Sequence, residues 1–157
     1  MARPRKKAKT RAPRPVVRAT LSDAERRLLA LAQRLGAGID DPAGLAAALA
    51  TLTTEYSADA ALPRAMCGAW LGSRKDKTAA LALAWAREQV RLALRDVLER
   101  ARTRAPLGVD ADTLAWLLLA ACEALAYEPA SAVADRVRIL FEITGAAGTS
   151  AAPSASV

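Results

Sequence analysis

The chain has 157 residues, of which 53% are hydrophobic, 25% charged and only 4% aromatic, a length and composition that fit one domain with a substantial core. Alanine, leucine and arginine are abundant and β-branched residues are sparse, which predicts an all-α fold. Histidine is absent, paired carboxylates and a glycine-rich phosphate loop are missing, and the two cysteines lie far apart, so we expect no metal, no cofactor and no enzymatic activity.

The excess positive charge lies at the start of the chain, in MARPRKKAKTRAPRPVVR. These 18 residues hold eight of the 23 Lys and Arg and no acid, which leaves 15 basic against 16 acidic side chains in the remainder. Three prolines and clustered like charges predict a disordered arm over residues 1–19. Its cations can bind nucleic-acid phosphates without reading sequence; the alternative is a solubilising tail that binds nothing specific. The candidate contacts are Arg3, Arg5, Lys6, Lys7, Lys9, Arg11, Arg14 and Arg18.

The arm is unlike a targeting segment. It lacks the apolar stretch of a secretory signal, and its prolines disfavour the amphipathic helix of a transit peptide. The longest apolar run, residues 114–122, is less than half as long as a membrane span. We therefore expect a soluble cytoplasmic protein that has no membrane partner.

Three helices are predicted in the first half. The first follows the capping-box pattern of Ser22 and Glu25 and ends at the glycines of 36–38. The second begins at Asp41, with Pro42 in its first turn, and presents one leucine-rich face. The third is short, from about 63 to 70, and is broken at Gly72.

Three further helices are predicted in the second half. The fourth and longest covers about 76–104, with an apolar stripe and a charged, solvated face. The fifth, about 110–127, is apolar on two faces and must pack between partners. The sixth covers 131–144, and the small polar residues 146–157 are predicted to be disordered. We expect Cys67 and Cys122 to be reduced and buried.

The segment VDADTLAWLLLAACEALAYEPASAVADRVRILFEITG resembles the last two helices of TetR-family transcriptional regulators. GSRKDKTAALALAWAREQVRLAL is similar to the stretch that ends the family's DNA-binding unit and starts its long connecting helix; Gly72, Ser73, Lys75 and Leu81 carry this likeness. The resemblance implies a bacterial homodimer with a DNA-binding helical region over 20–74 and a ligand-binding and dimerisation region over 75–145. Its interface would be a four-helix bundle that includes Leu114, Leu118, Leu125, Val133, Val137 and Leu140.

The region of the expected helix-turn-helix departs from the family pattern. SADAALPRAMCGAW stands in place of the glycine-containing turn and the recognition helix, and Arg64 is the only cation of 63–70. Because base edges are read by residues such as Arg, Asn and Gln, we expect an atypical or degenerate unit.

Two functions stay open from the sequence. The first is a dimeric TetR-type DNA-binding regulator, in which the arm, Arg64 and Lys75 contact DNA and Trp85 and Trp116 form walls of a pocket for a small apolar effector. Ordinary core packing is the alternative for both tryptophans. Glu123 is a candidate to hold a cationic effector or an interface arginine, although a water-facing carboxylate is the simpler expectation. The second function is a non-catalytic helical interaction module that binds nucleic acid non-specifically through its arm.

Overall fold

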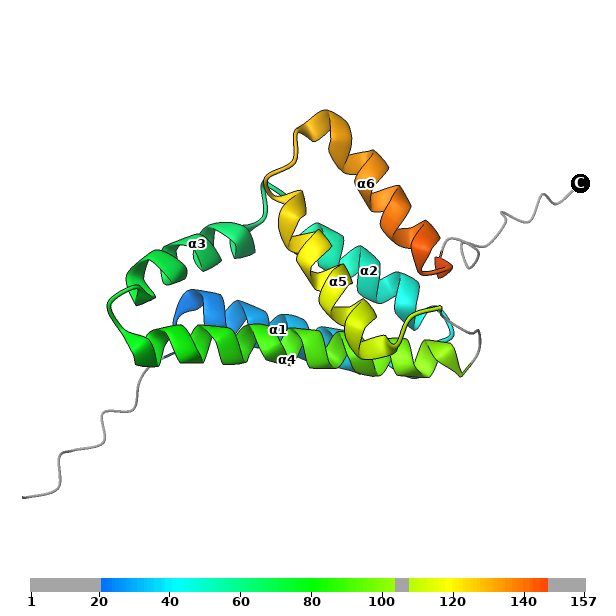
Figure 1. The fold of residues 1–157 in the computed structure, drawn as a ribbon, viewed down its shortest axis with the longest axis horizontal. Coiled ribbons are helices and arrows are strands. Elements are labelled where there is room, and N and C mark those ends of the chain that lie inside the picture. Colours follow the sequence, from blue (N-terminus) through cyan, green and yellow to red (C-terminus); the bar gives the residue numbers. More distant parts are fainter. Residues whose placement is uncertain (1–20, 104–107, 147–157) are drawn as a thin grey trace, which may run out of the picture.

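The computed structural model describes residues 21–103 and 108–146, whose secondary-structure elements are all helices, joined by turns (Figure 1). The arm expected over 1–19 and all but the first residue of the tail expected over 146–157 lie outside these ranges. The all-α prediction is confirmed. The helices are α1 Asp23–Ala37, α2 Gly44–Glu55, α3 Ala61–Ser73, α4 Lys77–Arg102, α5 Ala111–Leu125 and α6 Ala130–Ile143.

Side-chain caps begin three of the helices. At α1 the Ser22 hydroxyl accepts a hydrogen bond from the Glu25 N–H at 3.3 Å, and the Glu25 carboxylate accepts one from the Ser22 N–H at 3.2 Å. This reciprocal capping box confirms the prediction for the first helix. Asp76 and Asp110 cap α4 and α5, because their carboxylates accept hydrogen bonds from N–H groups of the first turn.

The structure corrects two helix boundaries. α2 begins at Gly44 instead of Asp41, because the Asp41 carboxylate accepts a hydrogen bond from the Ala43 N–H at 2.8 Å and its carbonyl accepts one from the Gly44 N–H at 2.9 Å. These bonds form a turn ahead of the helix. α3 is longer than expected and includes Gly72. A glycine inside a helix costs only about 1 kcal/mol, which packing of α3 against α4 and α1 outweighs.

The core lies between the long helix α4 and the helices around it. α1 lies along α4 and makes the most extensive contact in the fold, and α4 also packs against α2, α3 and α5 (Figure 1). α2 contacts α5 and α6 as well. One apolar cluster therefore runs from α1 to α6, centred on buried leucines such as Leu28, Leu49, Leu94 and Leu118. The burial expected on two faces of α5 is not observed: Leu118, Leu119 and Cys122 belong to one buried face, whereas Trp116 and Leu117 on the other side are about half exposed.

The directions of α1 and α4 determine which ends of these helices lie together. Figure 1 shows that α1 and α4 run in the same direction, so that α1 begins at the same end of the molecule as the turn joining α3 to α4. None of the described helices is both long enough and apolar enough to cross a membrane.

Candidate functional site

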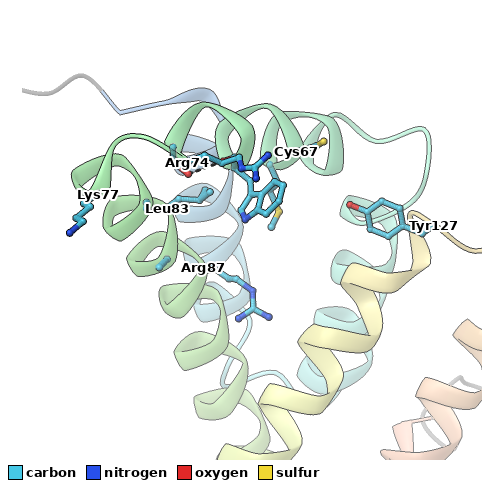
Figure 2. A pocket seen from close by; sticks show the side chains of 11 residues that line it. Cys67, Arg74, Lys77, Leu83, Arg87 and Tyr127 are labelled. Carbon is cyan, nitrogen blue, oxygen red and sulfur yellow. Dashed lines mark hydrogen bonds between the residues drawn. The ribbon is translucent and has the colours of Figure 1, made fainter.

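An open pocket of about 730 Å³ lies between α3 and the first half of α4 (Figure 2). Tyr127, in the connection between α5 and α6, lies across the opening, and its hydroxyl is directed toward α3 and α4. Trp70, Met66 and Leu83 belong to its apolar wall. None of the described residues that line the pocket is acidic.

The spacing of the lining residues explains why the pocket exists. On α3 the lining residues Met66, Trp70 and Ser73 are four and three residues apart. On α4 the lining residues are three or four apart from Lys77 to Arg87. This is the spacing of one helix face, so one side of each helix faces the pocket. On α4 this side carries alanines at 80 and 84, whose single methyl groups do not fill the gap between the helices. The small side chains leave a cavity where larger ones would form core.

Cations border the apolar wall. Arg74 holds its guanidinium 5.6 Å from the centre of the Trp70 ring, a cation–π contact, and Lys77 begins α4 one turn further on. Neither Arg74 nor Lys77 forms an ion pair with any described residue. The carboxylate that lies between them in sequence, Asp76, is bonded to backbone N–H groups of α4. This end of the pocket therefore has a positive charge excess.

The third cation of the pocket, Arg87, is held by Glu123 of α5. Its Nε and Nη2 donate to the two carboxylate oxygens at 2.6 and 2.7 Å, and the hydrogen bonds to Glu123 raise the pKa of Arg87. The expectation that Glu123 faces water is wrong, since its side chain is only 23% exposed and binds an arginine of its own chain. The pair closes the α5 side of the pocket and joins the two helices.

Tyr56 is buried within electrostatic reach of this pair. Its hydroxyl has no hydrogen-bond partner among the described residues, and burial, with the negative charge of Glu123 as a further cause, raises its pKa. Cys122, also buried near Glu123, has its pKa raised to about 12 by burial. Cys67 is exposed at the pocket, so the expectation that both cysteines are buried is wrong for Cys67. The open pocket leaves the Cys67 side chain uncovered, which explains the difference.

The two tryptophans expected to form an effector site lie apart from this pocket. Trp85 is 55% exposed on α4 and is not among the lining residues, while Trp116 is 53% exposed and borders a shallow cavity of about 200 Å³ with Arg91 and Asp112. Neither is packed in the core. An effector site at these two residues stays a prediction.

The residues expected at a dimer interface belong largely to the interior of the chain. The four leucines of that set are buried and the two valines are half-buried. A homodimer built on them stays a prediction. The set comprises Leu114, Leu118, Leu125, Leu140, Val133 and Val137.

The expected nucleic-acid contacts within the described residues are Arg64 and Lys75. Arg64 is exposed on α3 and donates a hydrogen bond to the Asp59 carbonyl at 3.0 Å. Lys75 lies in the turn between α3 and α4, next to Arg74 and close to Lys77, and we call Arg74, Lys75 and Lys77 the cationic end. By contrast, nine arginines of the described helices are paired with carboxylates: Arg26, Arg27, Arg34, Arg87, Arg91, Arg95, Arg100, Arg102 and Arg138.

Sequence reasoning missed most of the pocket. The sequence patterns gave no role in a pocket to Trp70, Lys77, Arg87 or Tyr127, all of which line it. The available signal was the alanine pair at 80 and 84 on the side of α4 that follows Lys77, because a stripe of small residues between polar ones indicates a gap in the packing.

Fold and site together define the class of protein. The described residues form an all-helical domain with one continuous apolar core and an open apolar pocket bordered by cations. Comparison with protein-family models, with curated proteins and with solved structures gives no match for this chain. Membership of the TetR family therefore stays a prediction from sequence resemblance.

Proposed function

We propose that the protein binds nucleic acid through contacts with the phosphate backbone, without reading base sequence. The observation that supports this is the position of the free positive charge. The cationic end, whose side chains form no ion pairs with described residues, lies at the end of the molecule where α1 begins (Figure 1). The sequence that directly precedes α1 contains the eight basic residues of the arm.

Phosphate binding by such a group of cations follows from polyelectrolyte physics. Each cation that neutralises a phosphate of duplex DNA releases condensed counterions, and the logarithm of the binding constant falls with the logarithm of the salt concentration by about 0.9 for each contact. The arm supplies most of the affinity in this proposal, and the cationic end extends the contact onto the folded body. Phosphate contacts position a protein but carry no base information, so one duplex is bound as well as another.

A TetR-type dimeric regulator in the bacterial cytoplasm, with a small apolar effector, is the second candidate. The order of three shorter helices followed by the 26-residue helix α4 favours it. Two features make base reading poor in this candidate. α2 packs against α4, α5 and α6 as well as against α3, and the outward guanidinium on α3, that of Arg64, is bonded to a carbonyl of its own chain.

Fluorescence anisotropy separates the two candidates. The full chain is titrated against the duplex upstream of its own gene and against a scrambled duplex of the same length, over a salt series. Equal affinities that fall together with salt support phosphate binding. A clear preference for the upstream duplex, retained when residues 1–19 are removed, supports the regulator instead.

The contribution of the cationic end is tested with one variant and one matched control. Lys75→Gln should reduce the salt slope by about 1. Arg136→Gln removes another cation that has no ion pair with described residues, but from α6, and should leave the slope unchanged. Equal slopes for the two variants contradict a role for the cationic end.

A further inference from the structure

We infer that the pocket between α3 and α4 binds a small organic anion with a flat apolar body. This inference goes beyond the proposed nucleic-acid binding: the two share Arg74 and Lys77, but this one also requires the cavity and its apolar wall. The volume of about 730 Å³ lies in the range of about 300–1,000 Å³ that small-molecule sites occupy.

The apolar body of the ligand is specified by the wall on α3 and α4. Trp70 is 60% exposed although its indole is one of the largest apolar groups in the chain, and Met66 and Leu83 continue the surface that it begins. Covering exposed apolar surface favours binding of an apolar group. A flat ring suits this wall best, because an indole face offers a broad planar contact and Tyr127 faces the same space from the other side (Figure 2).

The anionic group of the ligand is specified by the charges around the opening. Arg74, Lys77 and Arg87 all line the pocket, and its described lining contains no carboxylate. Glu123 balances the charge of Arg87, whereas Arg74 and Lys77 form no ion pair with described residues. The charge of Arg74 therefore lies beside Trp70, where a carboxylate or sulfonate attached to a ring in contact with the indole would be within reach, and Lys77 adds a second positive charge at the border of the same pocket.

The test uses two probes that differ in one charge. 1-Anilinonaphthalene-8-sulfonate carries a sulfonate, and N-phenyl-1-naphthylamine has the same rings without it. We expect the sulfonate to bind the full chain at one site and more tightly than the uncharged probe. Lys77→Gln should weaken sulfonate binding about two- to fivefold, as expected for loss of one exposed ion pair, and should leave the uncharged probe unaffected. Lys75→Gln is the matched control, because Lys75 is two residues away and does not line the pocket.

The location of the probe is read from a single tryptophan. Trp85→Phe and Trp116→Phe together leave Trp70 as the sole indole, and both replaced side chains are more than half exposed, so the fold should tolerate the changes. The sulfonate should quench Trp70 emission and protect it from acrylamide. Trp70→Ala in the wild-type background should weaken both probes.

Three results would overturn the inference. These are equal affinity for the two probes, equal effects of Lys75→Gln and Lys77→Gln, or Trp70 emission that does not respond to the probe. If sedimentation shows a dimer in which Trp70 is protected without any probe, the pocket is covered by a second copy of the chain, and the inference also fails. Failure of nucleic-acid binding alone leaves it standing, since that assay depends on Lys75 and the arm.

Discussion

Arg87 on α4 and Glu123 on α5 are joined by two parallel hydrogen bonds, 2.6 Å from Nε to Oε1 and 2.7 Å from Nη2 to Oε2. The planar guanidinium and the carboxylate match in this geometry, so the pair fixes both the distance and the rotation between the two helices. It is also the boundary between the core and the pocket, because Arg87 lines the pocket while Tyr56 and Cys122, close to Glu123, are buried.

Glu123→Gln should lower the free energy of unfolding by about 1–2 kcal/mol. The change leaves the half-buried guanidinium of Arg87 without its counter-charge, but partial exposure moderates the loss. Urea unfolding followed by circular dichroism measures it. Glu99→Gln is the control, since Glu99 and Arg102 are 3.8 Å apart and largely exposed, and it should change stability by less than about 0.5 kcal/mol. Equal changes in the two variants would mean that the α4–α5 pair contributes no more than a surface pair.

Tyr56→Phe should leave stability at pH 7 unchanged or raise it by up to about 1 kcal/mol, because the hydroxyl that it removes is buried and has no partner among the described residues. The pKa of Tyr56 is raised in the folded protein, so the folded state keeps the proton that the unfolded state loses near pH 10. Its contribution to stability is therefore complete below about pH 10 and is lost as the pH rises further.

The variant should accordingly lose less stability than the wild type between about pH 9 and 11. Burial raises the pKa of Cys122 to about 12, so this thiol causes part of the loss of stability at alkaline pH in both proteins. Unfolding curves across this pH range test the difference. A loss of more than about 1 kcal/mol in Tyr56→Phe at neutral pH would show that the hydroxyl makes a stabilising hydrogen bond.

Gly44→Ala should destabilise the protein by about 1–3 kcal/mol, because a Cβ at this position would lie 2.5 Å from the carbonyl oxygen of Gly38. Neither group can yield without moving the turn that starts α2. Gly36→Ala, within α1, meets nothing within 4 Å and should be neutral or stabilising by up to about 1 kcal/mol. Thermal unfolding of both variants checks the prediction, and a loss of stability in Gly36→Ala as large as that in Gly44→Ala would contradict it.

One thiol of the native protein should react quickly with Ellman's reagent and the other only on unfolding. Cys67 is exposed, whereas Cys122 is fully buried and its raised pKa disfavours the reactive thiolate. Cys67→Ser should abolish the fast reaction and leave the slow one. Fast release of two equivalents from the wild type at neutral pH would indicate that α5 opens readily.

The fold class followed from the sequence because alanine and leucine at helical spacing, with a capping box at Ser22 and carboxylate caps ahead of α4 and α5, are local signals. The start of α2 did not follow, since Asp41 can cap a helix or close a turn and the choice depends on the close approach of Gly44 to Gly38. The length of α3 was underestimated because Gly72 is a weak helix former that tertiary packing overrides.

The candidate site was harder to predict, since it depends on which helices meet. Glu123 was recognised as unusual on an apolar helix, but its partner Arg87 is 36 residues away and on another helix. Trp85 and Trp116 have the large apolar side chains expected of pocket walls, whereas the pocket forms beside Trp70, where alanines on α4 leave space. Sequence periodicity assigns a residue to a face of its helix, but the partner of that face is set by packing over the whole chain.

The salt dependence of nucleic-acid binding tests the central proposal most directly. The full chain and a form in which the eight Lys and Arg of residues 1–18 are replaced by Gln are titrated against one mixed-sequence duplex over a salt series. The slope of log K against log salt should be steeper for the full chain by several units, up to about 7 if every arm cation contacts a phosphate. The Gln form should retain a shallow slope, which Lys75→Gln lowers by about 1. Equal slopes for the two forms, or no binding by the full chain at low salt, would contradict phosphate binding by the arm and the cationic end.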